Sequence, residues 1–361
     1  MRGLINEYGW IIRLFSAVCV LAAAIFVCSP AADGFYAFED ENTERTSPSD
    51  TAELMSDITV KEEPSGETAA GNTSAGEYAV PEDIIRLQNE FSEEYKDKET
   101  AGTVRDGDFV LSAATDVIGN VAVRNTTAAL KPDFAALIEK GCELDADTDG
   151  PLVLIFHTHT TESYLMTDDG YFYKDYQTKS TDPGKNVIRV GDEICRVLDE
   201  RGIKYIHDTA VYDGEYNGAY SRSRVSVEKY LAEYPSIKIV LDVHRDAIYY
   251  SETEHGKQSH EINGKKAAQI MIIAGAEDSG ITGFPDWEYN LRFALELQKK
   301  AQEKYYGLMK PVYFCPRKYN MDTARCSVLL EIGTDANTLD EAVYSAHLLG
   351  GALADVIGDH K

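Results

Sequence analysis

Two histidines and a glutamate follow directly on an apolar segment of the chain. The stretch 153–164, VLIFHTHTTESY, starts as a strand-like apolar run and continues with His157, His159 and Glu162. Two later apolar runs end in a similar way: IVLDVHRD carries His244, and SVLLEIGTDAN carries Glu331. Imidazole and carboxylate groups held rigidly at strand ends are the ligands of a catalytic zinc ion, which keeps one coordination position open. Together the three stretches predict a zinc-dependent hydrolase.

The sequence alone leaves the choice of zinc ligands open. In an extended chain His157 and His159 point to the same side, so both could face the metal. We favour a division in which one binds the metal and the other orients it or bonds the backbone, because metal-binding histidines usually have such partners. The third ligand is Glu162 or Asp182. The segment EHGKQSH, which is more typical of a mobile solvated flap, offers two spare candidates, His255 and His260.

Glu331 interrupts an otherwise apolar strand. A buried glutamate is costly unless it is paired or functional. We expect Glu331 to act as the catalytic proton shuttle, taking a proton from water and delivering it to the leaving amine. The alternative is an internal ion pair with an arginine, for which the sequence offers Arg222, Arg224 and Arg325. Arg245, next to His244, could hold a substrate carboxylate or form an ordinary surface ion pair.

The bulk composition limits the partners of the protein. The chain has 361 residues and a net charge of −26, from 61 acidic and 35 basic residues. Phosphate binding needs a basic face, so this balance argues against nucleic acid as a ligand. Much of the acidic excess lies in the N-terminal third of the chain.

The N-terminal third predicts export and a long tether. An apolar run from Trp10 to Cys28, with Arg2 before it and Arg13 within it, approaches the roughly 20 residues that span a bilayer. We therefore favour an uncleaved, single-pass signal anchor at residues 1–33, with the rest of the chain outside the cytoplasm. The alternative is a signal peptide cleaved at the small residues Ser29 and Ala31. Residues 34–107 are acidic and poor in apolar residues, which predicts a flexible linker with a short helix at 82–95. The catalytic domain is expected to cover 108–361.

Strand-like and helix-like segments alternate in this domain. Expected strands cover 152–156, 203–206, 237–243, 269–275 and 327–332, and expected helices cover 186–202, 221–234, 289–307 and 339–358. Near-continuous apolar strands separated by helices predict an α/β fold, with a mostly parallel sheet and helices on both faces. In such sheets the active site lies beyond the carboxyl ends of the strands, where the histidines and Glu331 are expected.

Four cysteines fall in the part of the chain expected outside the cytoplasm: Cys142, Cys195, Cys315 and Cys326. Their spacing chooses no disulfide pairing. Cys195 and Cys326 fall at apolar positions of an expected helix and strand, as small core residues do. No CxxC pair occurs, which argues against a structural zinc knot.

Three motifs resemble those of the stage II sporulation protein P family: HTHTTESY, LDVHRDA and LLEIGTDANTLDEA. That family is related in fold to zinc-dependent N-acetylmuramoyl-L-alanine amidases, and the resemblance runs from about residue 119 to the C-terminus. It places His159 and His244 at the two zinc histidines, and Glu331 with Asn337 in the closing motif that carries the catalytic glutamate. We expect Asn337, like Arg245, to contact the substrate. The sequence departs from the wider amidases after His159, where Thr-Thr-Glu-Ser-Tyr replaces a glycine-rich turn that precedes a glutamate ligand.

The resemblance implies a membrane-anchored peptidoglycan hydrolase of engulfment during spore formation. Its implied reaction is cleavage of the amide between muramic acid and L-alanine, and in addition of a peptide cross-link. It also implies partnership with the stage II sporulation proteins D and M. The alternatives are another zinc amide hydrolase of the cell wall, such as a carboxypeptidase or deacetylase, and a wall-binding scaffold with an inactive site.

Overall fold

The structure is a computed structural model that describes residues 78–107, 113–278, 280 and 282–361. The expected signal anchor and residues 34–77 of the expected linker lie outside these ranges. Among the described helices, none has the length and apolar character needed to cross a membrane.

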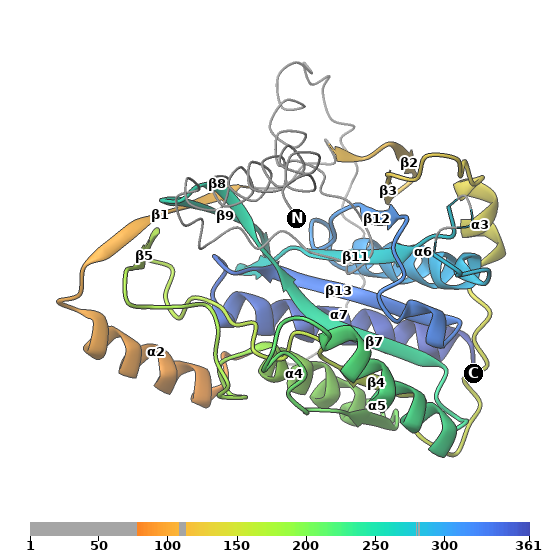
Figure 1. Ribbon diagram of the computed structural model, residues 1–361, viewed down its shortest axis with the longest axis horizontal. Coiled ribbons are helices and arrows are strands. Elements are labelled where there is room, and N and C mark those ends of the chain that lie inside the picture. Colours follow the sequence, from red (N-terminus) through yellow and green to blue (C-terminus); the bar gives the residue numbers. More distant parts are fainter. Residues whose placement is uncertain (1–77, 108–112, 279, 281) are drawn as a thin grey trace, which may run out of the picture. The chain divides into compact units, whose positions relative to one another are not determined.

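A central eight-stranded sheet carries the strands on which the sequence places the site (Figure 1). Its order is β2 (Asp116–Ile118), β3 (Val121–Asn125), β12 (Val312–Cys315), β11 (Ile270–Gly275), β13 (Cys326–Thr334), β7 (Ile239–Asp246), β4 (Val153–Phe156) and β6 (Tyr205–His207). The β2–β3 and β11–β13 pairs are antiparallel. The remaining neighbours pair in parallel. The α/β class is therefore confirmed, and the sheet is mixed.

Helices cover both faces of this sheet. Alternate residues of a strand point to opposite sides, and in these strands the residues on both sides are apolar and pack against helices. Ile155 and Leu241 join the apolar cluster that also contains Val190 and Val343. Val190 belongs to α4 (Val187–Glu200) and Val343 to α7 (Leu339–Asp359). Residues of α6 (Trp287–Lys304) pack in the same cluster. On the other face, Leu154 packs in a smaller cluster with residues of α5 (Ala219–Glu233). The expected helices are thus found close to their expected bounds. A further short helix, α3 (Phe134–Lys140), and a 3-10 turn, η4 (Met321–Thr323), complete these layers.

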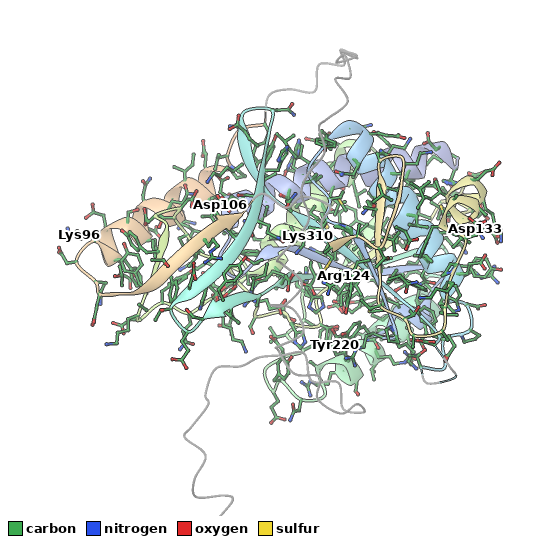
Figure 2. The ribbon with its side chains drawn as sticks, turned by 90° about the horizontal axis from the view of Figure 1, so that it is seen from above. Lys96, Asp106, Arg124, Asp133, Tyr220 and Lys310 are labelled. Atoms are coloured by element: carbon green, nitrogen blue, oxygen red, sulfur yellow. The ribbon has the colours of Figure 1, made fainter. Side chains whose placement is uncertain are left out.

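A second, smaller sheet was not foreseen from the sequence. It consists of β10 (Lys265–Ala268), β9 (Glu254–Ile262), β1 (Thr100–Gly107) and β5 (Tyr171–Tyr173), with β8 (Ile248–Ser251) paired to β9. The prediction of a solvated flap at EHGKQSH is therefore wrong, because this segment is β9. Its polar side chains are held by ion pairs: Lys257 is buried and lies 2.7 Å from both Asp168 and Glu341. Figure 2 labels Asp106 on β1, whose carboxylate accepts a hydrogen bond from Ser259 of β9.

Residues 82–107 are ordered, although the sequence assigns them to the flexible linker. The expected short helix is α2 (Glu82–Tyr95), and β1 follows it. One face of α2 is buried through Ile84, Leu87 and Phe91, which join the main apolar cluster. β1 pairs in parallel with β9 and antiparallel with β5. For this stretch the linker prediction is wrong, because three apolar residues at helical spacing bury enough surface to dock the helix. The assignment of 1–33 and of 34–77 stays a prediction.

Candidate metal centre and active site

The candidate residues come from three adjacent strands of the central sheet. β4, β7 and β13 are consecutive neighbours that run in parallel, so their carboxyl ends lie at one edge. The Cα atoms of Glu331 and His244 pair across β13 and β7. His157, His159 and Glu162 lie just beyond the end of β4.

His244 lies between two carboxylates. Its side chain is fully buried, with Nδ1 3.4 Å from Glu162 Oε2 and Nε2 2.8 Å from Asp242 Oδ1. Burial alone would lower the pKa of His244, but these two carboxylates raise it well above its usual value. Burial would likewise raise the pKa of Glu162, and contact with His244 instead holds it at about 2. Without a metal, His244 and Glu162 thus form an ion pair in which the imidazole is fully buried and the carboxylate is partly exposed.

His159 stands beside this ion pair in an aromatic enclosure. Its ring centre lies 5.3 Å from that of His244. Tyr216 stacks on it at 4.8 Å with an interplanar angle of 6°, and Tyr220 meets its edge at 5.5 Å. Tyr220 is labelled in Figure 2 and belongs to α5. Burial lowers the pKa of His159, which favours the neutral imidazole that a metal ligand requires.

His157 points to a different environment. Its Nδ1–H donates to the Val243 carbonyl at 2.9 Å, and its Nε2 lies 2.9 Å from His207 Nε2. A Cβ atom on Gly191 would lie 2.9 Å from His157 Nε2 and 2.7 Å from His207 Nε2, so the close approach of α4 requires glycine there. Burial lowers the pKa of His157 to about 3. Both ring nitrogens are engaged, so the structure does not bring His157 into the group.

Asp242 is a site residue that the sequence reasoning missed. Its Oδ1 accepts a hydrogen bond from the Thr158 backbone N–H at 2.8 Å, and its Oδ2 accepts one from the Thr158 hydroxyl at 2.7 Å. The carboxylate is thereby fixed against His244 and ties the segment after β4 to β7. A signal was available, because residues two apart on a strand face the same side, and Asp242 precedes His244 by two.

Glu331 is almost fully buried at 2 % exposure. Among the described residues its Oε2 is one of the buried oxygens without a hydrogen-bond partner. Burial and the nearby Asp246 raise its pKa well above the usual value. The expected alternative, an ion pair with Arg222, Arg224 or Arg325, is not what the structure has: these three contact other carbonyl and carboxylate oxygens. A buried carboxyl group with a raised pKa is suited to take up a proton and return it.

Arg245 and Asn337 have structural contacts in place of the expected exposure to substrate. Arg245 is buried, and its guanidinium donates to the backbone carbonyls of Ser163, Thr178 and Asp246 at 3.0–3.2 Å. Asn337 is fully buried and closes the turn after β13: its Oδ1 accepts from the Thr334 N–H at 2.9 Å, and its Nδ2 donates to a glutamate of α7 at 2.8 Å. Both therefore position the site segments.

The alternative ligands lie elsewhere. Asp182 is exposed, and its carboxylate accepts a hydrogen bond from the Gly184 N–H at 2.9 Å. His255 stacks on Phe172 at 4.2 Å in the second sheet. His260 lies in the same strand, β9, against Gly307. Of the candidates for third ligand, Glu162 is the one that contacts His244.

The donor set of His159, His244 and Glu162 fits a zinc ion in its chemistry, with two imidazoles and one carboxylate. The buried Oε2 of Glu331 and the enclosure of His244 by carboxylates support a cation at this place. Among the described residues, ligand atoms that all lie within 4.8 Å of one another occur at another place, Cys142, Glu296 and His360. The side chains of His159, His244 and Glu162 therefore have to move closer together to bind one ion.

The chain belongs to the stage II sporulation protein P family, whose sequence model matches residues 38–357. One curated relative, the stage II sporulation protein P of Bacillus subtilis (strain 168), is 30% identical over 223 residues. That alignment covers 58% of this chain and 51% of the relative, so the chain spans about half the length of the relative.

Several solved structures of amidases show a slight likeness to this chain. The N-acetylmuramoyl-L-alanine amidase AmiC2 of Nostoc punctiforme matches with a TM-score of 0.34 and 11% identity, over 59% of this chain and 98% of its own. The CwlD amidase from Clostridioides difficile, solved in complex with the GerS lipoprotein, matches with a TM-score of 0.36 and 11% identity, over 58% of this chain and 98% of its own. Likenesses of this extent assign no activity.

Proposed function

We propose that this protein is a zinc-dependent peptidoglycan hydrolase that cleaves the amide between N-acetylmuramic acid and L-alanine during engulfment in spore formation. Membership of the stage II sporulation protein P family supports the setting. The observation that carries the chemistry is the pairing of Glu331 with His244 in adjacent strands, beside Glu162 and His159. A buried carboxyl group next to histidine and glutamate side chains that can bind a metal is typical of a metal-assisted amide hydrolase.

His159, His244 and Glu162 would hold the ion, and Asp242 would fix the His244 ring from its other nitrogen. When bound, zinc would polarise the scissile carbonyl and lower the pKa of water. Tyr216 stacks on the His159 ring and Tyr220 meets its edge. Thr158 donates two hydrogen bonds to Asp242, the carboxylate that contacts His244. Asp242 is therefore tied to the segment that carries His159.

Glu331 would move the proton. As the C–O bond forms, it accepts a proton from the attacking water, and as the C–N bond breaks, it returns that proton to the departing amine. Burial raises the pKa of Glu331, so once this carboxyl is ionised it is a stronger base than an exposed glutamate. Cleavage of a peptide cross-link would require the same groups.

The proposal is tested by digesting purified peptidoglycan with the full-length protein, with and without a metal chelator, and reading the products by mass. The expected result is stem peptides that begin with a free L-alanine amine, in the untreated sample alone. Release of D-alanine would indicate a carboxypeptidase, and loss of acetyl groups a deacetylase. Absence of any product from metal-loaded protein would favour a wall-binding scaffold.

We further propose that residues 1–33 anchor the chain in the membrane, with the catalytic domain outside the cytoplasm, and that the stage II sporulation proteins D and M are its partners. Family membership and the apolar N-terminal run support this placement. Cell fractionation and protease accessibility in sporulating cells test the topology. Co-purification of the two partners with the tagged full-length chain, from cells stopped at engulfment, tests the partnership.

A further inference from the structure

Four chemically reactive side chains from distant parts of the sequence meet at the other end of β13. Cys142 follows α3, Glu296 lies in α6, Cys326 opens β13, and His360 follows the last turn of α7. Cys326 and Glu331 are five positions apart on one strand (331 − 326), which is roughly 16 Å at about 3.3 Å per residue. This cluster is therefore separate from the candidate active site.

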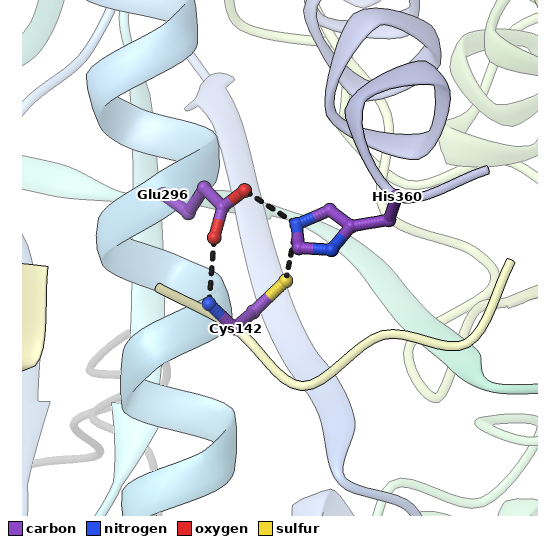
Figure 3. A group of neighbouring side chains, drawn as sticks. All are labelled: Cys142, Glu296 and His360. Carbon is purple, nitrogen blue, oxygen red and sulfur yellow. Dashed lines mark hydrogen bonds and ion pairs between the residues drawn. The ribbon is translucent and has the colours of Figure 1, made fainter. Parts of the chain in front are cut away.

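Three of these side chains converge on one point (Figure 3). His360 Nε2 lies 2.7 Å from Glu296 Oε1 and 3.3 Å from Cys142 Sγ. The second oxygen of Glu296, Oε2, accepts the Cys142 backbone N–H at 2.6 Å. This last contact fixes the carboxylate and leaves Oε1 directed at the imidazole and the thiol.

We propose that Cys142, Glu296 and His360 bind a structural zinc ion. Thiolate, imidazole and carboxylate are the three kinds of zinc ligand in proteins. Zinc bonds of about 2.0–2.3 Å place tetrahedral ligands roughly 3.3–3.8 Å apart. The Cys142–His360 contact already has that spacing, and the Glu296–His360 contact needs to widen by roughly half an ångström.

The hydrogen-bonding alternative accounts for the cluster less well. One N–H on His360 Nε2 can donate at full strength to only one of its two neighbours, Glu296 Oε1 or Cys142 Sγ. A charged His360 at the C-terminus of α7, paired with Glu296, would satisfy the helix end but leave the thiol unused. An ion at the centre uses a lone pair of each group at once.

The surroundings hold the ligands in place without a metal. Cys142 is buried at 6 % exposure and Cys326 at 2 %. The neighbouring Cys326 thiol and burial raise the pKa of Cys142. Arg292 of α6 donates to the Gly141 carbonyl and lies 3.0 Å from Glu143, so it fixes the segment on both sides of Cys142. Zinc uptake would displace the thiol proton and tie the end of α7 to α6 and to the loop after α3.

The test uses cobalt(II) as a spectroscopic substitute for zinc in the full-length protein, purified under reducing conditions and stripped of metal. We expect a thiolate-to-cobalt charge-transfer absorption in the near ultraviolet. The proposed catalytic ligands contain no thiol, so this absorption reports the cysteine site alone, independently of the proposed activity. It should persist in His244→Ala and in the matched control Cys195→Ser, a buried thiol on α4.

Loss of the absorption in both Cys142→Ser and His360→Gln is the expected result. The His360 side chain is partly exposed, so its variant should fold even if the serine variant does not. Absence of the absorption in the folded parent, or its survival in either folded variant, would overturn the proposal. So would a Cys142–Cys326 disulfide in the purified protein that, once reduced, still takes up no metal.

Discussion

His244 and Glu331 face each other as a Cα pair across β7 and β13, 87 residues apart in sequence (331 − 244). The pairing brings a fully buried imidazole and an almost fully buried carboxyl to one edge of the central sheet. Asp242, two residues before His244, and Glu162, after β4, hold the imidazole from either side. The proposed chemistry depends on this arrangement, since it puts the proton acceptor beside the proposed metal ligands.

Changing Glu331 to glutamine should remove hydrolysis and leave metal binding intact. The amide keeps the size of the side chain but cannot take up a proton, so we expect a loss of roughly 10²–10⁴-fold in the rate of peptidoglycan cleavage. Zinc content, measured on the same samples, should match that of the parent. A variant that cleaves at the parent rate would exclude Glu331 from the proton transfer.

The third ligand is tested by a pair of matched variants. Glu162→Gln should weaken zinc binding at the His159–His244 site, because Glu162 contacts His244 and its pKa is held at about 2 as a carboxylate. Asp182→Asn should bind zinc as the parent does, since Asp182 is exposed and engaged in its own turn. Zinc affinity is measured by competition with a chelator of known strength, in a His360→Gln background. The opposite ranking of the two variants would contradict the assignment.

Asp242→Asn should reduce zinc affinity by roughly 10–100-fold, the usual effect of losing a group that orients a ligand. The reason is its 2.8 Å contact with His244 Nε2. Thr158→Val serves as the control, because it removes one of the two hydrogen bonds that hold Asp242 but leaves the carboxylate in place. We expect a smaller loss for the control. If neither Asp242→Asn nor Thr158→Val lowers the zinc affinity, Asp242 does not orient the His244 ring.

A pH dependence of stability is expected from Glu193, which lies buried between α4 and α7. Burial would raise its pKa, but contacts with His347 and Arg196 lower it below the usual 4.5. Because the folded-state pKa is the lower one, Glu193 adds stability above pH 4.5, and this contribution is lost as the pH falls through the folded pKa.

The variant Glu193→Gln should therefore be less stable than the parent at neutral pH, by about 1–3 kcal/mol. The difference should shrink as the pH is lowered below 4.5. Urea unfolding at several pH values measures it, and Glu200→Gln, exposed on the same helix and paired with the same arginine, is the matched control. A difference that is constant with pH would show that the titration of Glu193 is not coupled to folding.

The central sheet and the placement of His244 and Glu331 could be predicted because they follow from local signals. Apolar runs mark β4, β7 and β13 as buried strands, and parallel neighbours bring their carboxyl ends together. The choice between His157 and His159 could not be made this way. It depends on the Val243 carbonyl and on His207, which occupy the ring nitrogens of His157.

The second sheet left no comparable signal. β9 reads as a polar segment because its buried positions are occupied by groups such as Lys257, whose ion pairs with Asp168 and Glu341 come from other parts of the chain. The Cys142 cluster is similar: Cys142 and His360 are 218 residues apart, and no short motif links them. The absence of a CxxC pair argues against a zinc knot built from one short segment, but it does not bear on groups that come from distant parts of the chain.

The most direct measurement is a crystal structure of the zinc-loaded protein with diffraction recorded at the zinc absorption edge. The account predicts an anomalous peak bonded to His159, His244 and Glu162 at about 2.0–2.2 Å, with the Glu331 carboxyl facing the open position. A zinc-loaded, active protein with no peak between these three side chains would contradict it.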